Sequence, residues 1–258
     1  MRQEIIVELN KLEIQLDIII LYAVESGSRA WGFASTNSDW DVRFIYVHKR
    51  KWYLSIDEQK DSYNKILPNE IDLSGWELKK TLKLFRKSNP PFMEWLDSPI
   101  IYKENYSTIK KLREVRFEFF NPKGCMYHYL SMAVSNFREY LQGDLVRIKK
   151  YFYVLRPILA CSWIKRTNTM APMEFEVLLN NEIQDASIFQ QIETLLDRKK
   201  AGEELDLEPR IEILNDFLKQ KIEYFQTFMK DFDIRIQPDT EKLNQIFIDT
   251  LDEIENNS

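Results

Sequence analysis

ESGSRAWG, residues 25–32, is followed by NSDWDVR at residues 37–43, and these two stretches decide the fold. An apolar run at residues 18–23 leads into the first stretch and is typical of a buried strand. Gly27 lets the backbone approach a ligand closely, and the residues after Ser28 open a helix whose free N–H groups suit phosphate. The first stretch therefore predicts an anion-binding turn between a strand and a helix.

The second stretch supplies paired carboxylates. Asp39 and Asp41 stand two residues apart at the start of a β-rich run, residues 42–47. Because side chains alternate along a strand, both are expected on the same face. Their charges repel unless a cation lies between them, and oxygen ligands favour Mg²⁺ or a similar hard ion. Asp72, in a third strand predicted at residues 70–73, adds a third carboxylate if that strand lies beside them.

The two stretches do not fit other common motifs. Asp-x-Asp alone is more often a solvated strand end or turn, and a Gly-Ser pair alone carries no information. An EF-hand loop is excluded because Arg43 and Ile45 occupy positions that such a loop reserves for other residues. Gly27 and Gly32 have neither the P-loop nor the Rossmann spacing. The order of turn, carboxylate pair and later carboxylate is what favours a metal-binding role of the carboxylates over a solvated turn.

The patterns along the chain change from mixed to helical. After the strands at 18–23, 42–47 and 70–73, the sequence predicts a helix at Trp76–Lys87 and no strand beyond about residue 104. We therefore expect an α+β domain with a small sheet over residues 1–120 and an all-helical domain over residues 121–258. Helices are predicted at Leu9–Leu16, Lys123–Gln142, Leu145–Ile164, Ile183–Leu196, Pro209–Met229 and Thr240–Ile254.

Composition narrows the class of protein. The 258 residues are 44% hydrophobic and 30% charged, with no apolar run long enough to span a membrane and no secretory signal pattern. Two cysteines, Cys125 and Cys161, suggest neither a disulfide framework nor a zinc site, so we expect a cytoplasmic protein without membrane contact. The net charge of −5 argues against a protein that wraps duplex DNA, although residues 141–170 are locally basic.

The basic segment contains candidate nucleotide-binding residues. In the predicted helix, three- and four-residue steps place Lys149, Tyr153 and Arg156 near one face. A triphosphate site needs such cations. The alternative is an exposed basic face with the aromatic residues in the core. Arg29, beside the Gly-Ser turn, is either a phosphate ligand or solvated.

Other charged residues carry less information. Lys79, Lys80 and Lys83 are either solvated helix charges or a path for a nucleic acid strand. His128 and His48 are interpreted as structural residues.

Five stretches together resemble a known superfamily. They are Gly27–Gly32, Ser38–Phe44, Asp72–Trp76, Asn89-Pro90 with Glu94–Leu96, and Lys149–Pro157. The order is similar to the signature of the polymerase-β nucleotidyltransferases. The sequences of these stretches resemble a bacterial branch of RNA-repair-associated predicted nucleotidyltransferases, some of which accompany RNA ligases. The likeness covers roughly residues 18 to 180.

This resemblance implies a fold, a reaction and a set of roles. The fold would be a polymerase-β-like catalytic domain with a small mixed sheet, followed by a helical domain that binds substrate and nucleotide. An acceptor hydroxyl, with an RNA end as the first candidate, would take a nucleoside monophosphate from a nucleoside triphosphate and release pyrophosphate. The alternatives are a protein or small-molecule acceptor, or a nucleotide- or RNA-binding module without turnover. The implied roles are two Mg²⁺ ions bound by Asp39, Asp41 and Asp72, and a nucleotide bound by Gly27, Ser28, Arg29, Lys149, Tyr153 and Arg156.

Overall fold

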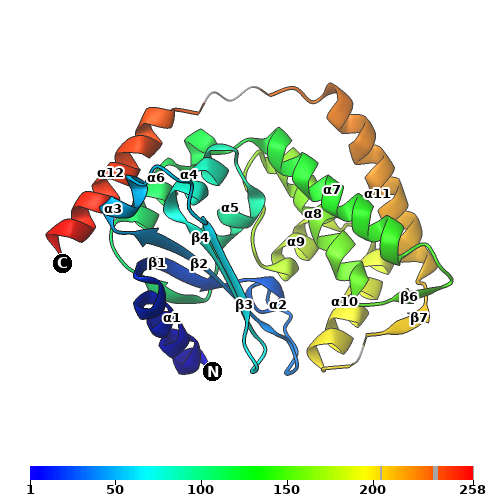
Figure 1. Cartoon of the computed structure of the whole chain (residues 1–258). Coiled ribbons are helices and arrows are strands. Elements are labelled where there is room, and N and C mark those ends of the chain that lie inside the picture. Colours follow the sequence, from blue (N-terminus) through cyan, green and yellow to red (C-terminus); the bar gives the residue numbers. More distant parts are fainter. Residues whose placement is uncertain (204, 235–237, 258) are drawn as a thin grey trace. The chain divides into compact units, whose positions relative to one another are not determined.

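The computed structural model describes residues 1–203, 205–234 and 238–257, which form two compact units (Figure 1). The first unit contains Met1–Ala30, Asp39–Phe119 and the C-terminal helix α12 (Thr240–Asn256). The second contains Trp31–Ser38 and the chain from Phe120 through helix α11 (Glu212–Asp231).

A five-stranded sheet forms the centre of the first unit, in the order β3-β4-β2-β1-β5. Strands β2 and β4 are parallel, and the other neighbouring pairs are antiparallel. The sheet is therefore mixed, and the predicted α+β fold class is confirmed. The strands are β1 (Ile18–Glu25), β2 (Trp40–His48), β3 (Ser62–Ile66), β4 (Ile71–Glu77) and β5 (Ile101–Glu104).

Helices α1 and α6 pack against strand β1, which is apolar on both faces. In β1 every residue except Ile19 is buried, as expected for a strand covered on both sides. Helix α1 places Ile5 and Leu9 against this sheet. Tyr22 points toward other helices, and its hydroxyl donates to the carbonyl of Trp95 at 2.9 Å. The helices of this unit besides α12 are α1 (Arg2–Leu16), α2 (Gly27–Ala30), α3 (Arg50–Tyr53), α4 (Leu78–Arg86), α5 (Pro90–Leu96) and α6 (Thr108–Phe119).

Helix α12 packs in the first unit, against α4 and α6. The buried hydroxyls of Thr108 and Thr250 lie 2.8 Å apart, and Lys111 forms an ion pair with Asp249 at 2.7 Å. The predicted helical domain, residues 121–258, includes this helix, but the contacts of the helix are with the first unit.

The second unit is helical around one apolar core. Phe33, from the segment Trp31–Ser38, contacts the rings of Phe152 and Phe175 in that core. The segment therefore belongs with helices that follow it by more than a hundred residues. Besides α11, the elements are α7 (Pro122–Tyr140), β6 (Leu145–Arg147), α8 (Lys150–Thr167), α9 (Phe175–Glu182), α10 (Ala186–Lys200) and β7 (Leu207–Pro209).

The structure corrects several predicted elements. Strand β4 does not stop at Gly75 but continues to Glu77, and α4 begins at Leu78. Gly75 leaves room for the ring of Phe44 on β2, because a Cβ at position 75 would lie 2.3 Å from that ring. The expectation of no strand in the second half was wrong, because β6 and β7 pair with each other. The predicted helix Leu145–Ile164 accordingly begins only at Lys150.

The longest helices carry charged side chains. They are α7, α8 and α11, of 19, 18 and 20 residues. Within the described part of the chain, no helix combines the length and the apolar character needed to cross a membrane.

Candidate active site

Two of the predicted carboxylates are direct neighbours in the sheet. Asp41 on β2 is the register partner of Asp72 on β4, and the two strands are parallel. Register partners on adjacent strands project from the same face of a sheet. The structure therefore brings together two residues that are 31 positions apart in the sequence.

Arg43 bridges these two carboxylates. Its Nη2 donates to Asp41 Oδ1 at 2.7 Å and to Asp72 Oδ2 at 2.9 Å. Its Nη1 donates to the backbone carbonyls of Asp72, at 3.0 Å, and Val42, at 3.3 Å. In the sequence, Arg43 served to exclude an EF-hand and belonged to the stretch Ser38–Phe44, but no role in the site was predicted for it. The available signal was its position two residues after Asp41, which places both side chains on one face of β2.

The environment of Asp41 makes its charge costly without a cation. Burial is the main cause that raises the pKa of Asp41. The positive charge of Arg43 opposes this increase, whereas the charges of Asp72 and Asp39 add to it. The three carboxylates thus interact electrostatically, and the charge of Arg43 offsets part of their mutual repulsion.

Asp39 lies just before β2 and is exposed. Its backbone carbonyl accepts a hydrogen bond from Arg29 Nε at 3.1 Å. The guanidinium of Arg29 also lies over the ring of Trp40, 3.6 Å from its centroid. Arg29 is therefore attached to the segment that carries Asp39.

The Gly-Ser turn packs against Asp41. Gly27 has a φ of 60°, and a Cβ at this position would lie 2.0 Å from Asp41 Oδ2. The N–H of Ser26 donates to the backbone carbonyl of Asp41 at 2.8 Å. Ser28 follows in the short helix α2 and is half-buried. Only glycine allows both the positive φ and the close approach to Asp41.

Glu25 is a second residue that sequence reasoning did not identify. Its side chain is fully buried, and it accepts hydrogen bonds from the Asp41 N–H, at 2.8 Å, and from the hydroxyl of Tyr102. Burial raises its pKa to about 7. The available signal was a carboxylate at the end of an otherwise apolar strand. Glu25 fixes the start of β2 where the carboxylates project.

We expect Glu25→Gln to change how stability depends on pH. A raised pKa means that the folded protein holds the proton more tightly than the unfolded chain. The stability that this residue contributes is therefore greatest below pH 4.5, the ordinary pKa of a glutamate, and it decreases until the pH passes about 7. Between these limits the free energy of unfolding of the wild type should fall by at most about 3 kcal/mol relative to that of Glu25→Gln. Denaturant unfolding of both proteins from pH 5 to 8.5, without divalent metal, measures this difference. The same pH dependence in both proteins would contradict it.

The donor atoms fit a hard divalent cation. Asp39, Asp41 and Asp72 offer only carboxylate oxygens, which Mg²⁺ prefers. Gly27 leaves the space beside Asp41 Oδ2 that a side chain would fill. In the described residues, however, no three acidic, histidine or cysteine side chains are gathered closely enough to hold a metal ion. Arg43 lies between two of the three carboxylates instead.

The remaining predicted nucleotide-binding residues lie in the second unit. Lys149 precedes α8, and it and Tyr153 are exposed. Arg156 is only 3% exposed, and its guanidinium lies 4.7 Å from the centroid of the Trp31 ring. Tyr153 contacts the same tryptophan edge-on. The Nζ of Lys150 lies over the ring of Tyr153, 4.7 Å from its centroid.

The other charged residues considered in the sequence either pack against neighbouring side chains or lie beside acidic side chains. His48 stacks on Trp52 with ring centroids 4.0 Å apart, and burial lowers its pKa. Lys80 forms an ion pair with Asp61 at 2.8 Å. Lys79 and Lys83 border the same pocket as that pair, together with acidic residues. Acidic side chains therefore offset part of the charge of these lysines.

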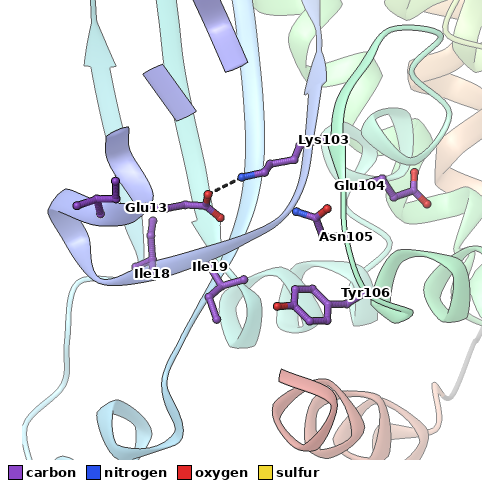
Figure 2. Close-up of a pocket in the computed structure, with 8 residues that line it drawn as sticks. Glu13, Ile18, Ile19, Lys103, Glu104, Asn105 and Tyr106 are labelled. Atoms are coloured by element: carbon purple, nitrogen blue, oxygen red, sulfur yellow. Dashed lines mark hydrogen bonds and ion pairs between the residues drawn. The ribbon is translucent and has the colours of Figure 1, made fainter. Parts of the chain in front are cut away.

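Figure 2 shows another pocket of the first unit, beside the end of α1, the start of β1 and the end of β5. Lys103 points across it to Glu13, with which it forms an ion pair, and Asn105 and Tyr106 lie beside it. None of the predicted metal- or nucleotide-binding residues lines this pocket.

Comparison with known proteins shows the family of this chain. Residues 1–249 match the RNA repair pathway DNA polymerase beta family, RlaP. YcgL from Bacillus subtilis strain 168, described as an uncharacterized protein, is 49% identical over 254 residues, which are 98% of each chain. A solved nucleotidyltransferase-like protein from Exiguobacterium sibiricum 255-15 is 15% identical, with a TM-score of 0.33 over 84% of this chain and 74% of that chain. The predicted family resemblance is thus confirmed, and the chain belongs to the RNA repair pathway DNA polymerase beta family of nucleotidyltransferases.

Proposed function

We propose that this enzyme is magnesium-dependent and transfers a nucleoside monophosphate from a nucleoside triphosphate to an acceptor hydroxyl. The observation that carries the proposal is the juxtaposition of Asp41 and Asp72 on parallel neighbouring strands. The charge of Asp39 acts on the same site, and Gly27 packs against Asp41. A cytoplasmic protein would meet nucleoside triphosphates as available substrates.

Each carboxylate has a proposed role. Asp39 and Asp41 would bind both Mg²⁺ ions, and Asp72 would complete the site of the second ion near the attacking hydroxyl. Bound Mg²⁺ would neutralise the negative charge of the triphosphate and of the leaving pyrophosphate. The acceptor oxygen forms a bond to the α-phosphorus, the bond from that phosphorus to the pyrophosphate oxygen breaks, and the hydroxyl proton passes to solvent water. Catalysis then rests on positioning and charge neutralisation, without a covalent enzyme intermediate.

The phosphate ligands are proposed from both units. Gly27 and Ser28 would hold the β- and γ-phosphates through their backbone N–H groups, with Arg29 beside them. Lys149, Tyr153 and Arg156 are proposed to bind the nucleotide from the second unit. On this proposal the first unit carries the chemistry and the second binds nucleotide and substrate.

Lys149→Ala should weaken triphosphate binding roughly 10- to 100-fold, because a hydrogen bond to a charged group contributes about 1.5–3 kcal/mol. Nucleoside monophosphate binding should change little, since this ligand lacks the phosphates that Lys149 is proposed to contact. Calorimetry with both ligands at fixed magnesium and ionic strength measures the two effects.

Lys230→Ala provides a control, because it removes the same charge from an exposed position on α11. This variant should bind both ligands as the wild type does. Equal losses for the two ligands in Lys149→Ala, or no loss for either, would show that Lys149 is solvated surface.

An RNA end is the proposed acceptor. The support is the description of the family, which names an RNA repair pathway. The test is to incubate the protein with α-labelled triphosphates, Mg²⁺ and short RNAs that differ only in the hydroxyl or phosphate at each end. We expect label to enter RNAs with one kind of end. Label entering proteins or small molecules of a cell lysate instead would favour another acceptor, and tight nucleotide binding without any product would favour a binding module.

A further inference from the structure

Arg43 occupies the place between Asp41 and Asp72 that a shared cation would need. One nitrogen, Nη2, lies 2.7 Å from an oxygen of Asp41 and 2.9 Å from an oxygen of Asp72. The arginine side chain is only 18% exposed, against 29% for Asp41 and 35% for Asp72. The guanidinium is therefore more protected from water than either carboxylate that it bridges.

The guanidinium is also attached to the backbone. Nη1 donates to the carbonyl of Asp72, on the neighbouring strand, and to the carbonyl of Val42, on its own strand. Two nitrogens of one rigid planar group thus make four hydrogen bonds across the β2–β4 pair. This arrangement stabilises two neighbouring carboxylates that would otherwise repel each other.

The same contacts oppose the binding of a metal ion. A Mg²⁺ ion needs carboxylate oxygens at about 2.0–2.1 Å, in near-octahedral geometry. An ion shared by Asp41 and Asp72 has to compete with the positive charge that already bridges them. Arginine does not lose its proton in proteins, so it cannot make way by becoming neutral. The guanidinium has to move.

We propose that Arg43 is a built-in counter-ion, which holds Asp41 and Asp72 together in the metal-free protein and is displaced when divalent metal binds. This inference rests on the proposed function, in which these carboxylates are metal ligands. Arg43 is then a positioning residue that weakens the binding of free metal. A metal ion that arrives bound to a triphosphate has further contacts to offset the displacement.

The test measures Mn²⁺ binding without nucleotide, by the electron paramagnetic resonance signal of the free ion and by calorimetry. Arg43→Gln removes the charge and keeps a polar but shorter side chain, and it should bind Mn²⁺ at least about tenfold more tightly than the wild type. Arg43→Lys keeps the charge but not the planar group that bridges two strands, and it should fall between the two. Without metal, Arg43→Gln should also melt at a lower temperature, and Mn²⁺ should raise its melting temperature more than that of the wild type.

Two further variants separate the possible failures. Arg50→Gln removes the same charge from a residue that pairs with Asp252 and Glu255, and it should bind Mn²⁺ as the wild type does. Asp41→Asn should lose Mn²⁺ binding, and retained binding would contradict the proposed metal site itself. If Asp41→Asn loses binding while Arg43→Gln or Arg43→Lys binds no more tightly than the wild type, the counter-ion role of Arg43 is wrong. If Arg43→Gln does not fold, the measurement on Arg43→Lys decides.

Discussion

Asp41→Asn should abolish nucleotidyl transfer and leave the fold intact. The variant keeps the shape of the side chain but loses the charge of a proposed metal ligand. The rate of transfer should fall at least about 10²–10³-fold, which is the loss that removing one preorganised group causes in other enzymes. Stability should change little: the lost ion pair with Arg43 is offset because a partly buried charge is removed, and Arg43 keeps its contact with Asp72. Asp39→Asn should behave in the same way.

Transfer rates and thermal unfolding, measured on the same preparations, test this separation. Asp61→Asn is the matched control, because Asp61 is an exposed partner of Lys80 in the same unit. The control should retain full activity. A loss of stability in Asp41→Asn without a specific loss of transfer would instead show that the pair is structural.

Gly27→Ala should both destabilise the protein and inactivate it. The alanine would need a φ of 60°, and its Cβ would lie 2.0 Å from Asp41 Oδ2. The left-handed backbone costs about 1–2 kcal/mol, and relieving the overlap adds a further ~1–3 kcal/mol. Because Asp41 must move to make room, transfer should fall by about 10²-fold or more.

Gly32→Ala separates the two causes. Gly32 also has a positive φ, of 86°, but no atom lies within 4 Å of a Cβ at that position. It should show the backbone cost alone, with nearly normal turnover. Denaturant unfolding and transfer rates of both variants make the comparison. Equal effects in the two variants would mean that contact with Asp41 is unimportant.

The sequence was sufficient to predict the order of the elements that carry the candidate site. The apolar strand before Gly27, the Asp-x-Asp at the head of the next strand and the later Asp72 are local patterns with a local cause. Alternation along the chain also predicted that Asp39 and Asp41 share a face, but the same pattern was not applied to Arg43. What the sequence did not reveal was that Asp41 and Asp72 are register partners, because strand pairing is set by contacts far apart in the chain.

Other features depend on packing that a periodic pattern does not specify. The helical pattern of residues 240–254 is clear, yet it does not tell which core the helix covers, and α12 packs with the first unit. Phe33 likewise packs in the second unit. Arg156 was expected with Lys149 on one cationic face, but α8 is buried on nearly all sides, and Arg156 packs on Trp31. The roles of Lys149 and Arg156 in nucleotide binding stay predictions.

The most direct test of the central claim compares two labels in one triphosphate. The protein is incubated with RNA acceptors, Mg²⁺ and a triphosphate labelled at either the α- or the γ-phosphorus. The account predicts that the α-label enters the acceptor, that the γ-label appears in pyrophosphate in equal amount, and that chelation of the metal stops both. Transfer of the γ-label to the acceptor, or α-label transfer that continues after chelation and in Asp41→Asn, would contradict it.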